Sequence, residues 1–372
     1  MLIVLFVICT VFICLNVIAY IGLSKVEYES KTAMIFPNPD VQQIFVSVIV
    51  AARNEAHNLP ALLNGLITQT HYPLEIIIVS DRSTDDTSAV VRFFQDERIR
   101  FVEIKEVPRG VSPKKHALAT GIRMARGEIL FLTDADCRPV PTWIADTLKC
   151  FDKRTAVVIG YSPFRKKENE KFIECFQRYE CFRTAMLSAG AVGRNAPYMA
   201  TGRNLAYRKE VFETIGGFNA IKHILSGDDD LLLQHIARKT RMKIKYFVSP
   251  TAEVETDPQP TLEKFLNQKA RHYSAAFHYP PASIFFLMTY HFVNFLMVFV
   301  LPFQLFIGGF SLLQAMSLFG EEEFRWKAVY LEPIYAVYAF FSPLLAFKKF
   351  EWKALRLHAC CGNKVLSISE VS

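Results

Sequence analysis

Charged residues are missing from two long stretches, Leu2 to Leu23 and Ile284 to Phe319, which contain no Asp, Glu, Lys or Arg. Roughly 20 apolar residues suffice for a helix to cross a bilayer. The first stretch also lacks a preceding basic segment and a small-residue cleavage site before Lys25, both typical of a removable signal peptide. Because 51% of the 372 residues are hydrophobic, a purely soluble protein is excluded, and we expect an uncleaved membrane anchor at residues 1–24.

The cysteines form neither a disulfide framework nor a paired CxxC zinc pattern, which favours reduced thiols in a reducing compartment. The same compartment follows from the charges, since no Lys or Arg precedes the first apolar stretch, whereas Lys25 and Lys31 follow it. We therefore expect an integral membrane protein whose main domain faces the cytoplasm. The eight cysteines are Cys9, Cys14, Cys137, Cys150, Cys175, Cys181, Cys360 and Cys361.

Signatures of nucleic-acid-binding modules are also missing, although the formal net charge is +7. Basic residues gather at Arg165 to Lys167 and in a tail at residues 348–372 that contains Lys348, Lys349, Lys353 and Arg356. Attraction to anionic lipid headgroups explains such clusters, so the membrane is an expected partner and nucleic acid is not.

The second uncharged stretch is too long for one upright crossing, because a helix over Ile284 to Phe319 would measure about 54 Å against a hydrocarbon core of about 30 Å. It either crosses once with tilt, or breaks near Pro302 into a hairpin. A single crossing would place the acidic loop Glu321 to Glu323 outside, and a weaker span, Ala328 to Phe347, would return the basic tail to the cytoplasm. The positive-inside rule favours that version, with two or three helices within residues 283–347.

Between the membrane parts, after a linker at residues 25–45, continuous apolar runs of strand length alternate with helix-like segments. Runs that are apolar throughout are typical of strands in a sheet covered on both faces. We predict an open α/β sheet, mostly parallel, in a domain spanning residues 46–260. The expected strands are Val46 to Ala52, Leu74 to Ser80, Ile99 to Ile104, Glu128 to Thr133 and Ala156 to Tyr161.

Acidic residues follow three of these strands: Glu55 after the first, Asp81 after the second, and Asp134 with Asp136 after the fourth. In open α/β sheets, ligands bind beyond the carboxyl ends of the strands, so these residues are candidates for chemistry. Asp134 and Asp136 suit a hard divalent cation that also contacts substrate phosphates. Alone, such a pair is more often a solvated turn, and the prediction therefore depends on the three acidic strand ends together.

The run from Val46 to Asp136 resembles the donor half of family 2 glycosyltransferases, inverting enzymes of the GT-A fold with an open mixed sheet flanked by helices. The resemblance implies that Glu55 and Asp81 hold the base and ribose of a nucleotide-sugar donor. It also implies that Asp136, with help from Asp134, binds Mg or Mn on the donor diphosphate. A UDP-sugar is the favoured donor.

Two segments resemble the acceptor half of the same family. Thr201 to Asn219 is similar to the segment that lines the acceptor site, and Ser226 to Gln234 is similar to the catalytic acidic motif. Alignment puts Asp229 at the position of the base that removes a proton from the acceptor hydroxyl, with Asp228 as the alternative one residue earlier. The alternative is a purely structural role, in which these acidic residues form the N-terminus of a helix at residues 231–238.

A third segment, Asn267 to Ser274, resembles the QxxRW motif of membrane synthases, with Gln268 and Arg271 kept and His272 in place of tryptophan. The resemblance implies that Arg271 contacts the diphosphate, as a bidentate guanidinium can. Lys114 matches a family lysine near the phosphates, and Lys115 is expected to be either a second donor contact or a solvated residue at a helix start.

The stretch Thr261 to Tyr279 also has the pattern of an interfacial amphipathic helix, which we place at residues 261–282. An aromatic cluster earlier in the chain is expected to serve packing or membrane contact rather than sugar stacking. Its members are Phe172, Phe176, Tyr179 and Phe182.

Together these features predict a metal-dependent, inverting glycosyltransferase that moves a sugar from a nucleotide diphosphate to an acceptor hydroxyl at the cytoplasmic membrane face. The acceptor is expected to be a lipid, a lipid-linked sugar or a glycan. Two alternatives remain: a nucleotidyltransferase with the same donor site, which would not need the acidic acceptor motif or Arg271, and an inactive membrane scaffold.

Overall fold

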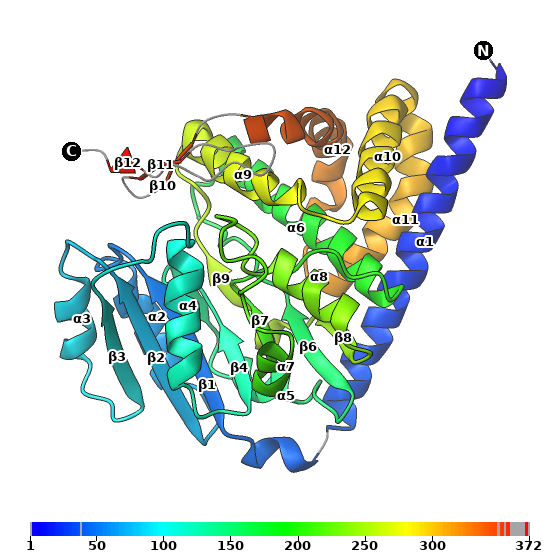
Figure 1. Ribbon diagram of the computed structural model, residues 1–372. Coiled ribbons are helices and arrows are strands. Elements are labelled where there is room, and N and C mark those ends of the chain that lie inside the picture. Colours follow the sequence, from blue (N-terminus) through cyan, green and yellow to red (C-terminus); the bar gives the residue numbers. More distant parts are fainter. Residues whose placement is uncertain (1, 38, 348–349, 353–354, 358–368, 371–372) are drawn as a thin grey trace.

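The computed structural model describes residues 2–37, 39–347, 350–352, 355–357 and 369–370 (Figure 1). Lys348, Lys349 and Lys353 of the predicted basic tail, and also Cys360 and Cys361, lie outside the described residues. Within the tail, β10 (Phe350–Trp352), β11 (Leu355–Leu357) and β12 (Ser369–Glu370) form a small antiparallel sheet.

A seven-stranded sheet with the order β3-β2-β1-β4-β7-β6-β8 forms the centre of the domain. Only β7 among these strands runs antiparallel to its neighbours β4 and β6, so the predicted open, mostly parallel mixed sheet is confirmed. The strands are β1 (Val46–Ala52), β2 (Leu74–Asp81), β3 (Ile99–Ile104), β4 (Ile129–Leu132), β6 (Thr155–Gly160), β7 (Leu205–Arg208) and β8 (Lys243–Phe247).

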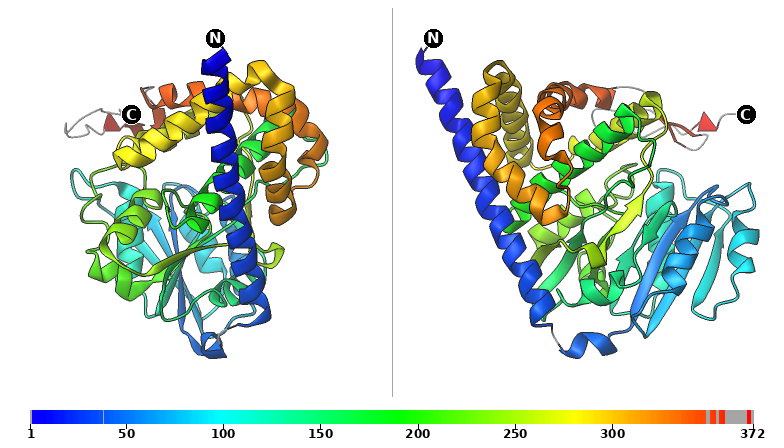
Figure 2. Two further views of the ribbon diagram at one scale, coloured as in Figure 1. Left: turned by 90° about the vertical axis from the view of Figure 1, so that its right-hand side faces the viewer. Right: turned by 180° about the vertical axis from the view of Figure 1, so that it is seen from behind.

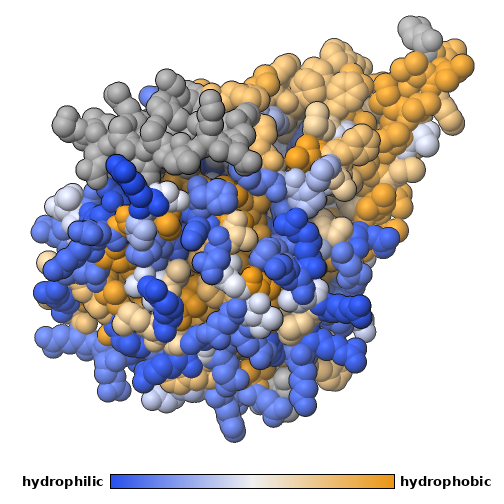
Figure 3. All heavy atoms as spheres, in the orientation of Figure 1, coloured by the Kyte–Doolittle hydropathy of each residue, from blue (hydrophilic) through white to orange (hydrophobic). Residues whose placement is uncertain are grey.

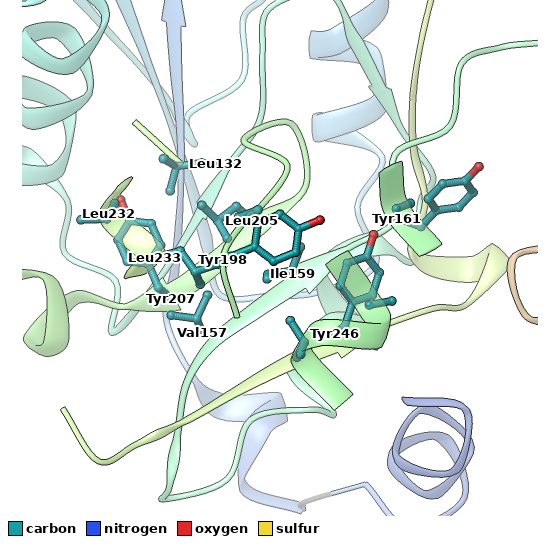
Figure 4. Close-up of a cluster of buried hydrophobic side chains, with 14 of the residues drawn as sticks. Leu132, Val157, Ile159, Tyr161, Tyr198, Leu205, Tyr207, Leu232, Leu233 and Tyr246 are labelled. Carbon is teal, nitrogen blue, oxygen red and sulfur yellow. The ribbon is translucent and has the colours of Figure 1, made fainter. Parts of the chain in front are cut away.

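Helices cover both faces of this sheet, which explains why every residue of β2 and β4 is buried. One face carries a cluster in which Leu205 and Tyr207 of β7 lie with Leu232 and Leu233 of α8 (Figure 4). The helices of the domain are α2 (Leu59–Ile67), α3 (Thr87–Phe93), α4 (Pro113–Met124), α5 (Trp143–Leu148), α6 (Phe172–Gly193), α7 (Lys209–Thr214) and α8 (Asp230–Lys239). A two-stranded sheet of β5 (Cys137–Pro139) and β9 (Val254–Thr256) and the short helices η1 (Pro39–Gln43) and η2 (Pro250–Ala252) complete it.

The N-terminal helix α1 (Leu2–Ile35) continues well past the predicted anchor boundary at residue 24, so the expected linker is helical as far as Ile35. The reason is tertiary contact with α6. A Cβ atom on Gly22 would lie 2.1 Å from the carbonyl oxygen of Gly190, which shows how closely the two helices approach. Lys25 Nζ then donates to Asn195 Oδ1 at 3.1 Å.

Three described segments are long and apolar enough to cross a membrane: Leu2–Ile35, Pro281–Phe319 and Phe324–Leu345. The second consists of two helices, α10 (Pro281–Met297) and α11 (Leu301–Phe319), separated by the turn η3 (Val298–Val300). Figures 1 and 2 show α10 and α11 side by side as a hairpin next to α1.

The structure therefore follows the alternative of a break near Pro302 rather than one continuous helix over Ile284 to Phe319. The side of the membrane on which the acidic loop lies stays a prediction. Glu321, directly after α11, accepts a hydrogen bond from the hydroxyl of Tyr161 at 2.7 Å, and Glu323 pairs with Arg178 and Lys166. These ion pairs hold the loop against the catalytic domain. The break before Pro302 allows the chain to fold back.

The last helices also pack against the rest of the protein. Ser342, at the start of η4 (Ser342–Phe347) after α12 (Phe324–Phe341), donates to the hydroxyl of Tyr273 at 2.7 Å on α9 (Leu262–Ala276). The apolar side of α9 packs inside the protein through Phe265, which is 1% exposed. Of the predicted aromatic cluster, Phe176, Tyr179 and Phe182 are buried packing residues, as expected, and Phe172 is exposed.

Candidate active site

A cleft of about 470 Å³ opens at the carboxyl ends of β1, β2 and β4. It is bounded by the acidic turn before α8 on one side and by α9 on the other. Every site residue predicted from the sequence lines it: Glu55, Asp81, Lys114, Asp134, Asp136, Asp228, Asp229, Gln268 and Arg271. Segments separated by more than half of the chain are thus brought to one place, although this placement does not test their roles.

The nucleotide end of the cleft is formed by the turns after β1 and β2. Asp81 is 3% exposed, and its carboxylate receives Arg82 Nε at 2.9 Å and lies 3.7 Å from Arg53 Nη1. Glu55 Oε2 accepts a hydrogen bond from Asn58 at 2.7 Å. Both carboxylates are acceptor groups fixed by neighbours, which suits recognition of ring N–H and ribose hydroxyl groups.

Asp134 and Asp136 follow β4 and form the floor of the cleft. Burial alone would raise the pKa of Asp134, but the ammonium of Lys114 and the guanidinium groups of Arg203 and Arg271 hold it below its ordinary value. The carboxyl is therefore ionised at neutral pH, as a cation ligand must be.

These two carboxylates fit Mg²⁺ or Mn²⁺ in a particular way. The described residues contain no group of three or more His, Cys, Asp or Glu side chains arranged to hold a metal ion. Mg²⁺ in phosphate-transfer sites is commonly bound by one or two carboxylates, with substrate phosphates and water as the other ligands. Asp134 and Asp136 match that pattern rather than a closed structural site.

Lys114 connects the floor of the cleft to the acidic motif. Its Nζ lies 2.9 Å from Asp134 Oδ1 and 2.9 Å from Asp228 Oδ2. The two acidic groups raise the pKa of Lys114 against the effect of burial, so the lysine stays charged. A single cation thus links the two halves of the cleft.

Asp229 is fixed differently from Asp228. Its two side-chain oxygens accept the backbone N–H groups of Gly202 at 2.9 Å and Asp230 at 2.8 Å. Burial and the neighbouring charge of Asp228 raise the pKa of Asp229 above its ordinary value, which suits a group that accepts a proton. Asp229 is also the N-cap residue of α8, so the purely structural interpretation, an acidic start of a helix, holds as well.

Asp230 closes this acidic turn next to the segment that leads into α10. It accepts the backbone N–H of Ala200 at 2.9 Å and the hydroxyl of Tyr279, the residue that precedes the α10–α11 hairpin by two positions. Burial and Asp229 raise the pKa of Asp230 well above its ordinary value. Its hydrogen bonds therefore join the acidic motif to the segment that precedes the α10–α11 hairpin.

One face of α9 covers the cleft with polar side chains. Lys264, Gln268 and Arg271 follow one another at spacings of four and three residues and therefore lie on the same side of the helix. Arg271 Nη2 lies 3.5 Å from His272 Nε2, and His272 also lines the cleft.

Arg203 is a cleft residue that the sequence prediction missed. Its guanidinium lies 4.9 Å from the centre of the Phe164 ring, donates to the Ser162 carbonyl at 3.4 Å, and helps to keep Asp134 ionised. The only sequence signal was its place in the segment Thr201 to Asn219, which had been assigned to the acceptor side.

Comparisons with known proteins agree with this geometry. Residues 47–216 match the family described as Glycosyl transferase family 2. The chain contains a family 2 glycosyltransferase domain. The matched region includes the donor carboxylates and the floor of the cleft, while the acidic motif and α9 follow it.

Curated relatives of this glycosyltransferase domain include Glycosyltransferase AglE of Haloferax volcanii, 29% identical over 189 residues, which are 50% of this chain and 59% of AglE. WfaP of Escherichia coli, a UDP-Glc:alpha-D-GlcNAc-diphosphoundecaprenol beta-1,3-glucosyltransferase, is 29% identical over 119 residues, 32% of this chain and 45% of WfaP. The chain thus spans about half the length of the curated relatives it matches.

The fold is also that of a solved glycosyltransferase. The mannosyltransferase PcManGT from Pyrobaculum calidifontis, in complex with GDP-Man and Mn²⁺, has a TM-score of 0.54 and 21% sequence identity to this chain. The alignment covers 91% of this chain and 98% of PcManGT. The expected GT-A fold is therefore confirmed.

Lys115 of the glycosyltransferase domain was expected to be either a solvated residue or a donor contact, and the structure shows neither. It is 1% exposed and is not among the residues that line the cleft, and its ammonium donates to the carbonyl oxygens of Ile224 at 2.5 Å and Ser226 at 2.6 Å. Burial lowers its pKa to about 8. Lys115 therefore holds the loop that leads into the acidic motif.

Replacing Lys115 with methionine should destabilise the domain, because two buried carbonyls lose their donor at about 1–3 kcal/mol each. We expect the apparent Tm of Lys115→Met to fall by roughly 4 °C or more. The neighbouring Lys114→Met is the matched control and should lower donor affinity while changing Tm less. Equal Tm values for the two variants would contradict the structural role of Lys115.

Proposed function

We propose that this chain transfers a sugar from a nucleotide-diphosphate donor to an acceptor hydroxyl, with inversion and with a divalent cation, at the cytoplasmic face of a membrane. The observation that carries the proposal is the Lys114 bridge between Asp134 and Asp228, which brings the metal-type carboxylates and the acidic motif into one cleft. An inverting transfer needs a base on the acceptor side of the reacting carbon and a group that stabilises the leaving diphosphate on the opposite side.

In this mechanism Asp229 accepts the proton of the acceptor hydroxyl while the hydroxyl oxygen attacks the anomeric carbon. The bond from that carbon to the donor diphosphate breaks in the same step, and inversion results. Bound Mg²⁺ or Mn²⁺, held by Asp134 and Asp136, would offset the charge of the leaving diphosphate. Arg271 binds the same diphosphate from the α9 side and needs no proton transfer to do so.

The nucleotide is recognised by the turns after β1 and β2, where Asp81 accepts the ribose hydroxyls and Glu55 accepts from the base. A UDP-sugar is the donor we propose, supported by the UDP-Glc in the name of WfaP. GDP-Man in the PcManGT complex shows that the related fold also accepts a guanine nucleotide. A panel of donors therefore decides the point.

A lipid or lipid-linked acceptor is supported by the apolar helices and by the diphosphoundecaprenol acceptor in the name of WfaP. A growing glycan is the other acceptor class. Lys25 and Lys31, which follow the apolar part of α1, support a cytoplasmic position of the cleft.

The decisive experiment incubates the detergent-purified chain and membrane extracts with UDP-, GDP- and dTDP-sugars, with and without Mn²⁺. Release of the nucleoside diphosphate together with a glycosylated product supports the proposal. A nucleotidyltransferase would instead attack the α-phosphorus of the donor, transfer the nucleoside monophosphate and release sugar 1-phosphate, and a scaffold would leave every donor intact.

We also predict that the product carries one or a few added sugars rather than a long polymer. His272 has a smaller and more polar ring than the tryptophan of processive synthases, so it holds a sugar chain less firmly between additions. Sizing of radiolabelled product should give a discrete glycolipid. A ladder that extends to high mass from one enzyme preparation would contradict this prediction.

A further inference from the structure

The α10–α11 hairpin presents an apolar surface that the rest of the protein leaves uncovered. Phe285, Phe299, Phe306 and Phe310 are 74%, 79%, 68% and 62% exposed. The hydrophobic colour in Figure 3 extends over this hairpin and the N-terminal part of α1, while the catalytic domain is mostly hydrophilic. A continuous apolar surface shared with a membrane-crossing helix needs lipid to cover it.

Both ends of the hairpin are tied to the catalytic domain. Before α10, the hydroxyl of Tyr279 donates to Asp230 of the acidic motif. After α11, Glu321 accepts from Tyr161 at 2.7 Å and lies 3.4 Å from Arg178 Nη2. The hairpin therefore enters and leaves the membrane on the side of the catalytic cleft.

The turn of the hairpin stops short of the far end of α1. Met297, which is 0% exposed, packs in a cluster with Phe12 of α1, and Val300 and Phe303 lie against the same cluster together with Ile8. From Ile8, α1 continues to Leu2, which is about 9 Å further along the helix axis at 1.5 Å per residue. The turn thus lies at the depth of the α1 interior.

The chemistry of the turn agrees with that depth. Val298 to Pro302 contains only apolar side chains, and the nearest polar ones, Asn294 and Gln304, are 5% and 3% exposed. A turn that reached water on the far side would expose the apolar ring of Phe299 to it, which is unfavourable. Lipid chains are the environment that fits.

We propose that α10 and α11 form a re-entrant hairpin that enters the hydrocarbon core from the side of the catalytic cleft, ends within it and does not cross the bilayer. α12 also starts and ends on the catalytic domain, through Glu323 and Ser342, and its Glu332 pairs with Arg183 of α6 at 3.0 Å. In the described part of the chain, α1 is then the one segment that crosses. This topology rests on the proposed membrane location.

A single crossing by α1 is also consistent with the charges. Every Lys and Arg of the sequence follows residue 24, and those among the described residues therefore follow the part of α1 proposed to cross the membrane. The hairpin beside the cleft would hold the catalytic domain at the membrane surface, where a lipid acceptor could reach Asp229.

The test is thiol accessibility of the full chain in sealed vesicles with the catalytic domain outward. Three single variants, Phe299→Cys, Leu2→Cys and Glu322→Cys, are treated with a membrane-impermeant maleimide-PEG added outside, loaded inside, or added after detergent. The unsubstituted chain gives the background of native thiols. Leu2→Cys reports the far side, and exposed Glu322→Cys reports the catalytic side.

We expect Glu322→Cys to react from outside, Leu2→Cys from inside, and Phe299→Cys from neither side until detergent is added. Reaction of Phe299→Cys from inside would show a hairpin that crosses twice, and reaction from outside would show one that never enters the membrane. Either result overturns the proposal. Sugar transfer is assayed separately in the same vesicles, so a failure of the proposed activity is distinguishable from a failure of the topology.

Discussion

Asp136→Ala should remove most sugar transfer, by roughly 10²-fold or more, because charge stabilisation of several kcal/mol at the leaving diphosphate depends on the cation that it helps to hold. Donor affinity should fall as well, since the cation bridges protein and diphosphate. Isothermal titration with the nucleoside diphosphate, with and without Mn²⁺, measures the binding loss. Initial rates of nucleotide release measure the loss of turnover.

The matched control is Glu97→Ala, an exposed carboxylate before β3, at the opposite edge of the sheet from the cleft. It should leave rate and affinity unchanged. Chelation by EDTA should reproduce the Asp136→Ala phenotype in the native chain, and added Mn²⁺ should restore activity there but not in the variant. Full activity in EDTA would mean that Lys114 and Arg271 alone support the leaving group.

The donor half of the cleft was predictable because its residues directly follow strands that can be recognised in the sequence. A buried parallel strand needs a continuous apolar run, and its end is marked by the first polar residues, so Asp81 and Asp134 could be placed at the sheet edge from the sequence alone. The carboxyl ends of parallel neighbours then meet without further information. The structure confirms this arrangement.

The direction of a side chain on α4 was not predictable in the same way. Lys114 and Lys115 are adjacent at the start of one helix, yet the first lies between Asp134 and Asp228 and the second binds carbonyl groups of a loop more than 100 residues later. Rotation of α4 against the sheet decides between these environments. Composition and spacing carry no information about that rotation.

The fold-back between α10 and α11 could not be predicted with certainty from the sequence, for a related reason. Hydropathy gives the length of an apolar stretch but not whether it folds back, and the positive-inside rule compares only the charges at its ends. What fixes the return of α11 is the set of bonds from Glu321 and Glu323 to Tyr161, Arg178 and Lys166. Those partners lie some 150 residues earlier in the chain.

Asp229→Asn is the second substitution with a large expected effect. The amide keeps the size of the carboxylate but cannot take up the proton of the acceptor hydroxyl, so turnover should fall by about 10²-fold or more. Donor affinity should survive, because the donor contacts lie on the other side of Lys114. Single-turnover rates and donor titration of the same preparation separate the two quantities.

Asp228→Asn is the matched comparison, and pH distinguishes the two carboxylates. Burial and the charge of Asp228 raise the pKa of Asp229, so in the native chain turnover should fall with decreasing pH at values above the ordinary carboxyl range of about 4. Asp228→Asn removes one cause of that shift. The acid limb of the pH–rate profile should therefore move to lower pH, while the maximal turnover is kept. Asp229→Asn should abolish the limb. If Asp228→Asn lost turnover instead and Asp229→Asn did not, the base would be Asp228, released from Lys114 when the donor binds.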